Sequence, residues 1–179
     1  MKYFVIAQFF GILGMIMNII SYQGKKQKSV ILMQFFGSLF FSVNMLMLGA
    51  IMGFMLNTIG IFRALIYSNK DKFKNIYIIN AIFMFMFVLS YIATFTIFKK
   101  EPSIFNIVVE FLPLIAMFAT TLGFSKKDAK SIRYMALISS PSWLLYDLIN
   151  ISLGGVVCEA MSLISVAIGI ARHDLKRSN

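Results

Sequence analysis

The sequence predicts an all-α membrane protein with seven transmembrane helices, built as two parallel three-helix repeats joined by one further helix. Three observations lead to this prediction: the apolar composition, seven long apolar runs, and the placement of Lys and Arg between those runs. Of the 179 residues, 59% are hydrophobic and only 13% are charged, whereas soluble domains carry about 25% charged residues. Composition alone therefore indicates the membrane class.

Each apolar run is long enough to cross a bilayer, which takes about 20 helical residues because lipid offers backbone groups no other partner. Two connections are very short, Gly49-Ala50 and Ile151-Ser152. Merging the helices beside them would require two helices of about 39 residues, far longer than a bilayer needs. The first run is longer than a signal-peptide core, and we expect it to be retained. The expected spans are 3–22, 30–48, 51–68, 76–98, 104–124, 132–150 and 153–171.

Lys and Arg lie mostly in alternate connections, which is the pattern of membrane topology. By this pattern, 14 of the 17 basic residues share one side, so that side is predicted to be cytoplasmic and the N-terminus to be outside. Arg63 and Arg133 lie within apolar runs near the basic side, and we expect both to snorkel toward it. The basic side contains Lys25, Lys26, Lys28, Lys70, Lys72, Lys74, Lys126, Lys127, Lys130, Arg172, Lys176 and Arg177, and the other side contains Lys2, Lys99 and Lys100.

A shift of 102 residues aligns the first three runs with the last three without a gap. Gly53 then coincides with Gly155, and polar Asn57 coincides with Glu159. The run at 76–98 carries no charge and supplies the extra crossing that two units of the same orientation require. The predicted parts are a first bundle at 1–68, a linker helix with its loops at 69–103, and a second bundle with a short cytoplasmic tail at 104–179.

Three stretches resemble a known family. They are the NIISYQ segment at 18–23, the SSPSWLLY segment at 139–146, and Cys158-Glu159 leading to the GIAR segment at 169–172. In these stretches and in length, the whole chain resembles the YgjV family of bacterial inner-membrane proteins. The resemblance implies a multi-pass protein of the inner membrane.

The 3+1+3 layout itself is similar to the SWEET and PQ-loop transporter superfamily, whose two triple-helix bundles face each other around a central pathway. Lys28-Ser29 and Lys130-Ser131 resemble the Lys-Ser pair of PQ-loop proteins, although Tyr22-Gln23 replaces the Pro-Gln turn. The family's prolines are thought to act as rocking points. Of these, Pro113 and Pro141 are present in the second repeat, while Gly11 and Leu39 take their places in the first. Gly11, Pro113 and Pro141 are the resulting hinge candidates.

The same resemblance implies a substrate site made by an aromatic residue and an asparagine of each repeat. Phe41 and Asn57 occupy these positions in the first repeat, and Trp143 and Glu159 in the second. Asn44 and Tyr146 lie three residues beyond the two aromatics, so we expect them to share the same helix faces. The expected substrate-binding set is Phe41, Asn44, Asn57, Trp143, Tyr146 and Glu159.

Glu159 is the strongest functional candidate, because a charged group at the centre of a spanning helix costs about 2.5–3.5 kcal/mol on insertion scales. Its functional interpretation is substrate binding or proton coupling, and the structural alternative is a neutral acid bonded to a neighbouring carbonyl. For Asn57 the alternative is interhelical bonding. Asp147 and Glu110 are expected nearer the outer surface, with Asp147 facing an outer vestibule. Gln8, Gln34, Asn18 and Thr120 are expected to be packing contacts.

Several classes of function find no support in the sequence. It contains no nucleophile elbow, P-loop or metal-binding spacing, and with one cysteine, Cys158, and one histidine, His173, we expect no metal, no cofactor and no enzyme. The net charge of +10 is spread over short loops, so no nucleic-acid partner is expected. The expected partners are the lipid bilayer and a small-molecule solute, and the sequence indicates no oligomeric state.

These observations lead to two hypotheses. The first is a SWEET-like carrier of the bacterial inner membrane that moves an uncharged or zwitterionic solute, such as a sugar or an amino acid, by alternating access. The second is a non-transporting membrane scaffold or sensor whose polar residues only hold helices together.

Overall fold

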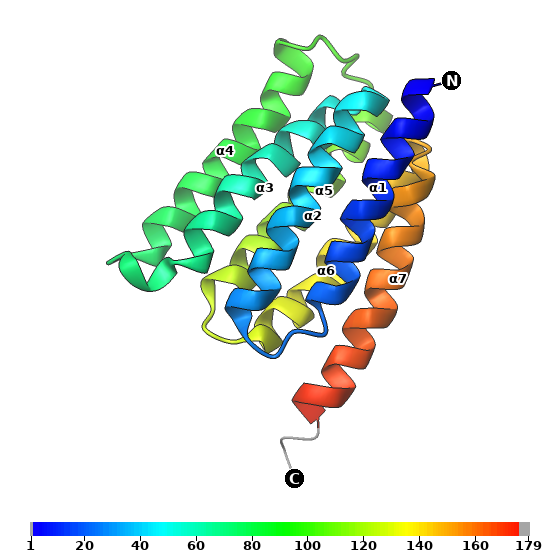
Figure 1. Ribbon diagram of the computed structural model, residues 1–179. Helices are drawn as coiled ribbons and strands as arrows, with labels where there is room; N and C mark the ends of the chain where they lie inside the picture. The colour runs from blue at the N-terminus through cyan, green and yellow to red at the C-terminus, as the bar shows by residue number, and fades with distance from the viewer. Residues whose placement is uncertain (1, 176–179) are drawn as a thin grey trace.

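The structure, a computed structural model, describes residues 2–175 and contains seven α-helices and no strand within that range (Figure 1). A short 3-10 helix, η1 (Lys70–Lys72), follows the third α-helix, and a π-helical turn, η2 (Ala171–Leu175), follows the last. Lys176 and Arg177 of the expected tail lie outside the described residues. The α-helices are α1 (Lys2–Ser21), α2 (Gln27–Leu48), α3 (Ile51–Ser68), α4 (Ile76–Thr96), α5 (Ile104–Ser125), α6 (Ala129–Ile149) and α7 (Leu153–Ile170).

The helices coincide with the expected apolar runs, with differences of a few residues at the ends. The largest differences are at the starts of α2 and α6, where each helix begins three residues before the expected apolar run. At α6 the cause is an N-cap, because the Asp128 carboxylate accepts a hydrogen bond of 2.7 Å from the Ser131 N–H. The prediction of seven helices is thereby confirmed.

Six of these helices are long and apolar enough to cross a membrane, and α6 is the exception. It has 21 residues but contains Lys130, Arg133 and Asp147 and is the least apolar of the seven. Whether α6 also spans the bilayer stays a prediction.

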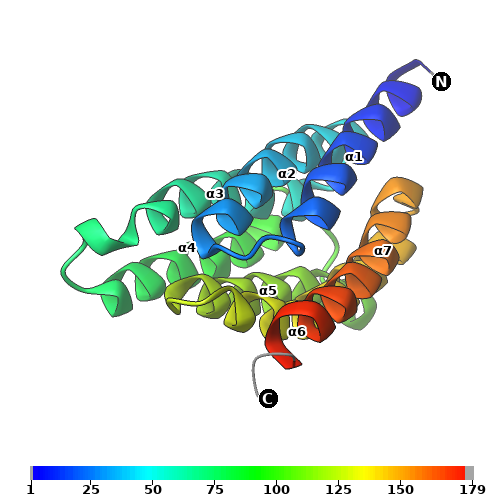
Figure 2. The ribbon, with the colours of Figure 1, turned by 60° about the horizontal axis from the view of Figure 1, so that its bottom comes forward.

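The helices form two rows, which Figure 2 shows edge-on. In one row α2 packs between α1 and α3, and in the other α6 packs between α5 and α7. Contacts of α1 with α7 and of α3 with α5 close the rows into a ring of six helices, while α4 packs on the outside of α3 and α5. The uncharged helix α4 contributes a polar contact, because its Asn80 is buried and accepts a hydrogen bond from the Tyr67 hydroxyl.

The distribution of exposed side chains is that of a lipid-facing bundle. Large apolar side chains are exposed along the outside, such as Ile104 at 84% and Phe85 at 63%. Polar side chains are buried inside, such as Asn44 and Thr121 at 0%. Apolar side chains outside and polar side chains inside are the reverse of the arrangement in soluble proteins. This arrangement is favourable only in lipid, where no water is available to bond an exposed polar group.

The basic connections all lie at one end of the ring. Figure 1 shows the α1–α2, α3–α4 and α5–α6 connections and η2 at one end, and the other three connections with the first turn of α1 at the opposite end. This grouping is what the predicted topology requires. The side of the membrane that each end faces stays a prediction.

Helices of the two halves begin with the same spacing. α2 and α3 begin at residues 27 and 51, and α6 and α7 begin at residues 129 and 153, so each pair is 102 residues apart. This is the shift that aligned the two halves of the sequence.

Candidate functional site

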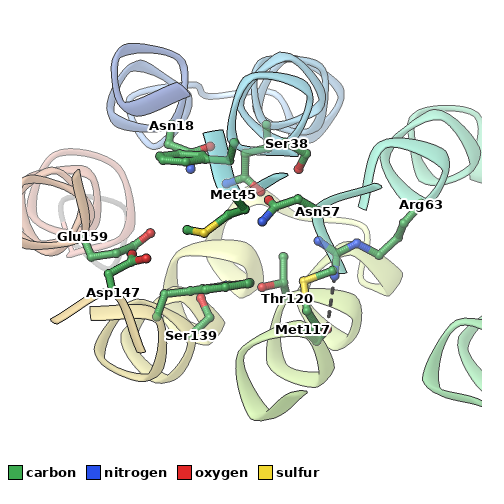
Figure 3. A pocket seen from close by; sticks show the side chains of 13 residues that line it. Asn18, Ser38, Met45, Asn57, Arg63, Met117, Thr120, Ser139, Asp147 and Glu159 are labelled. Atoms are coloured by element: carbon green, nitrogen blue, oxygen red, sulfur yellow. Dashed lines mark hydrogen bonds between the residues drawn. The ribbon is translucent and has the colours of Figure 1, made fainter. Parts of the chain in front are cut away.

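A small polar cavity lies inside the ring, between the two rows (Figure 3). Its volume is about 60 Å³. A buried water needs roughly 10–15 Å³ of such volume, so the cavity has room for only a few water-sized groups. All six helices of the ring contribute to its wall, through Asn18, Gln34, Ser38, Phe41, Met45, Asn57, Arg63, Met117, Thr120, Ser139, Trp143, Asp147 and Glu159.

Four of the six expected substrate-binding residues meet at this cavity. Phe41 and Trp143 supply aromatic wall, and Asn57 and Glu159 supply polar groups. The Asn57 Nδ2 donates to the Gly53 carbonyl of its own helix at 2.9 Å. Figure 3 shows Asn57 and Glu159 on opposite sides, with Met45 between them.

The other two expected residues do not line the cavity. Asn44 is fully buried and its Nδ2 donates to the Ala7 carbonyl at 2.7 Å, which joins α2 to α1. Tyr146 is 1% exposed and packs edge-on against Trp143, with ring centroids 5.7 Å apart. Asn44 and Tyr146 therefore support the cavity wall without lining it, through the α1–α2 contact and the Trp143 ring.

Asp147 lies beside Glu159, on the same side of the cavity (Figure 3). The two carboxyls come from α6 and α7, and their residues are 3% and 8% exposed. The Asp147 Oδ1 has no hydrogen-bond partner among the described residues. The expectation that Asp147 faces an outer vestibule is therefore wrong, because its side chain turns inward against α7.

The tight turn between α6 and α7 explains this placement. The Ser152 N–H donates to the Asp147 carbonyl at 2.9 Å, which folds α7 back immediately. A Cβ at Gly155 would collide with the Asp147 carboxyl. Glycine at this position in α7 therefore makes room for the acid.

Arg63 lies on the opposite side of the cavity from the acids (Figure 3). It is 4% exposed, and its Nη1 donates to the Met117 carbonyl at 3.1 Å and to the Thr121 hydroxyl at 3.0 Å. Its guanidinium carbon also lies 4.8 Å from the Phe124 ring centroid. The expectation that Arg63 snorkels is wrong, because α5 offers two acceptors and an aromatic face inside the bundle.

Arg133 also does not reach freely toward solvent. It is 3% exposed and its guanidinium binds the Asp174 carboxylate through Nε at 3.0 Å and Nη2 at 2.5 Å. Its Nη1 donates to the Gly24 carbonyl at 3.2 Å. Arg133 thus joins η2 to the α1–α2 connection.

These residues border a wide basic groove at the end of the ring that carries η2. The groove has a volume of about 1120 Å³. Nearby, two side chains bond the C-terminal end of α5. Gln27 Nε2 and Lys70 Nζ each donate to the Phe124 carbonyl at 3.0 Å. Burial lowers the pKa of Lys70 from its ordinary value. The groove is lined by Lys25, Lys26, Gln27, Lys127, Asp128, Ala129, Lys130, Arg133, Arg172, His173 and Asp174.

Glu110 is separate from the cavity. It is 1% exposed and forms an ion pair with Lys100. The expected hydration of Glu110 near the outer surface is therefore replaced by an ion pair in which Glu110 is buried and Lys100 is partly exposed.

The three hinge candidates lie in or beside this core. Gly11 faces Asn44, whose Nδ2 would lie 3.1 Å from a Cβ at that position. Pro113 and Pro141 lie inside continuous helices α5 and α6, where each removes one backbone hydrogen bond. A moving role for these residues stays a prediction.

Sequence reasoning missed several lining residues. Asn18, Gln34 and Thr120 were expected to be packing contacts, yet all three border the cavity. The 102-residue shift could have indicated these lining residues, because it pairs Asn18 with Thr120 and Met45 with Asp147. Among the described residues, no group of three or more His, Cys, Asp or Glu side chains could hold a metal ion.

Comparison with protein families agrees with the resemblance seen in the sequence. Residues 5–177 match the family model Imp-YgjV, described as bacterial inner membrane protein. Comparisons with curated proteins and with solved structures found no match. Since the match covers nearly the whole chain, the protein belongs to the Imp-YgjV family of bacterial inner membrane proteins.

Proposed function

We propose that this protein is a carrier of a small solute across the bacterial inner membrane, similar in mechanism to SWEET transporters. The observation that carries the proposal is the central cavity, which is bordered by three helices from each half of the chain and lined mainly by polar groups. Ligand sites typically combine apolar walls with a few convergent polar groups. Here Phe41 and Trp143 are the walls, and Asn57 and Glu159 are polar groups.

The proposal includes two parallel three-helix repeats, α1–α3 and α5–α7, with α4 as linker. The common 102-residue spacing of helix starts supports it. The cavity supports it as well, because Phe41 and Trp143 are 102 residues apart and so are Asn57 and Glu159. Equivalent positions meet in this way when two similar units pack face to face.

Alternating access would follow from rocking of the two units about the central cavity. In this conformation the cavity of about 60 Å³ is smaller than the roughly 300–1,000 Å³ of most ligand pockets. A carrier closed around its site has such a small volume, and rocking of the units would enlarge it toward one side. Gly11, Pro113 and Pro141 are the proposed hinges.

The proposed topology has all seven helices across the membrane, the N-terminus outside and the C-terminus in the cytoplasm. Grouping of the basic connections at one end supports it (Figure 1). In this arrangement two of the charged residues of α6 are buried inside the bundle, because Arg133 pairs with Asp174 and Asp147 faces the cavity, and the third, Lys130, lies at the basic end of the helix.

A ligand screen on purified protein tests the proposed carrier. Thermal unfolding would be followed with sugars, amino acids and nucleosides, and each compound that raises the melting temperature would be tested for uptake into proteoliposomes. A carrier takes up its ligand, and Trp143→Ala reduces that uptake because the cavity loses a wall. A folded protein that binds none of these classes contradicts the proposal.

One observation favours the alternative of a scaffold or sensor. Buried polar side chains already bond helices together, such as Asn44 Nδ2 to the Ala7 carbonyl at 2.7 Å and Ser165 Oγ to the Ile19 carbonyl at 2.8 Å. If all polar groups act in this way, substitutions at the cavity lower only stability. The uptake measurement separates the two functions.

A further inference from the structure

The central cavity is electrically polarised. Both acids that line it, Asp147 and Glu159, lie on one side, and the basic residue that lines it, Arg63, lies on the other (Figure 3). We propose that the cavity binds a small zwitterion of amino-acid type, with its ammonium group on Asp147 and Glu159 and its carboxylate on Arg63. This inference rests on the proposed carrier function and names the class of its solute.

The acidic side has the chemistry to bind an ammonium group. Asp147 and Glu159 come from two different helices and point into the same space (Figure 3). Both residues are more than nine-tenths buried, and the Asp147 Oδ1 has no partner among the described residues. An ammonium group has three N–H donors, which suffice for both carboxyls. A neutral sugar hydroxyl would leave such buried acids without a compensating charge.

The basic side has the chemistry to bind a carboxylate. Thr121 and the Met117 carbonyl hold Nη1 of Arg63, and this directs the other end of the guanidinium toward Asn57 and the cavity (Figure 3). The Nε has no partner among the described residues. A guanidinium that is fixed through one edge keeps donors for a carboxylate.

Size limits the ligand further. The cavity of about 60 Å³ holds on the order of five water-sized groups, and glycine has five heavy atoms while alanine has six. A hexose has twelve heavy atoms and exceeds the volume of the cavity in this conformation. Between the charged sides the wall is formed by Met45, Phe41 and Trp143, which suit a short aliphatic part.

Binding measurements on the full-length protein in nanodiscs test this inference. The probes are glycine, L-alanine and β-alanine, each compared with ethylamine, propionate and glycerol, which carry one charge or none. We expect the zwitterions to raise the melting temperature and to bind about ten- to a hundredfold more tightly than any single-charge probe, because each charged hydrogen bond contributes about that factor.

Substitutions at the three charged residues of the cavity test their roles in binding. Glu159→Gln and Asp147→Asn should each weaken zwitterion binding about tenfold or more, while Glu110→Gln, which alters a buried acid outside the cavity, should leave it unchanged. Arg63→Lys should retain part of the affinity, because the charge stays but the fork is lost. If Arg63→Lys does not fold, Thr121→Val, which removes one bond that orients Arg63, replaces it and should weaken binding of zwitterions but not of ethylamine.

The outcomes separate the inference from the proposed function. Tight binding and uptake of a sugar or nucleoside, unaffected by Glu159→Gln, would overturn the zwitterion and leave the carrier. A folded protein that binds no probe and no member of the wider screen would overturn both.

Discussion

Gly49 and Ile151 are 102 residues apart and both adopt a left-handed backbone conformation, with φ of 75° and 54°. Gly49 ends α2, and Ile151 lies in the matching turn between α6 and α7. The α2–α3 turn reverses the chain within two residues, and the α6–α7 turn reverses it within three. The two halves therefore use the same turn, although only one of them has the residue that favours it.

Replacing Ile151 by Gly should stabilise the protein. A β-branched residue in the left-handed region is strained by about 1–2 kcal/mol, and the Ile151 side chain is 69% exposed, so little packing is lost. We expect a gain of about 1 kcal/mol in the free energy of unfolding, measured by denaturant titration in mixed micelles.

Gly49→Ala is the matched control, because no atom lies within 4 Å of a Cβ at that position. It should destabilise by a similar amount through the backbone alone. An unchanged or lowered stability of Ile151→Gly would show that the turn in α6–α7 depends on the isoleucine side chain.

A second prediction concerns topology. A reporter fused after Lys130 should read inside and one after Lys100 outside, because Lys and Arg near short loops are retained in the cytoplasm. Alkaline phosphatase and a fluorescent protein, used in parallel, give opposite signals at each site. Readings opposite to these, or readings on the same side, would contradict the seven-span topology.

A third prediction concerns Gly155 and Asp147. Gly155→Ala should destabilise by about 1–3 kcal/mol, since its Cβ would displace the Asp147 carboxyl. In a double-mutant cycle, Asp147→Ala should remove most of that cost because it removes the colliding group. Additive effects of the two substitutions would contradict the close packing of α7 on Asp147.

The helices were predictable from the sequence because lipid imposes one strong rule, that every backbone group bonds within its own segment. Phe41, Asn57, Trp143 and Glu159, which one shift relates in the two halves of the sequence, line one cavity, and their substrate-binding role stays a prediction. The depth of a residue in a spanning helix and its spacing from the equivalent residue of the other half can both be counted along the sequence.

Side-chain direction was not predictable in the same way. Asn44 lies three residues beyond Phe41, which is about 60° away around an α-helix, and this suffices to turn it from the cavity to the α1 interface. Arg63 was expected to extend toward solvent, but acceptors on α5, a distant segment, hold it inside. The inward direction of the Asp147 side chain depends on the tight α6–α7 connection, which brings α7 against it.

A fourth prediction concerns the buried ion pair at the end of α7. Asp174→Asn should destabilise by about 1–3 kcal/mol, because it leaves Arg133 with a weaker partner. Arg172→Gln, which alters an exposed neighbour, should change stability by no more than about 0.5 kcal/mol. Equal effects of the two substitutions on thermal unfolding would show that the ion pair contributes nothing.

The last prediction concerns Glu159 as a proton-coupling group. Glutamine has the same shape and can hydrogen-bond, but it cannot release a proton, so Glu159→Gln should fold normally and lose the pH dependence of ligand binding or uptake. Uptake into proteoliposomes would be measured with and without an imposed pH gradient, using the tightest-binding compound of the screen. Glu110→Gln is the matched control, because Glu110 is buried but paired with Lys100 and lies outside the cavity. A Glu159→Gln protein that responds to the gradient like the unmodified protein would remove proton coupling from this residue and leave its role in binding to be judged by affinity alone.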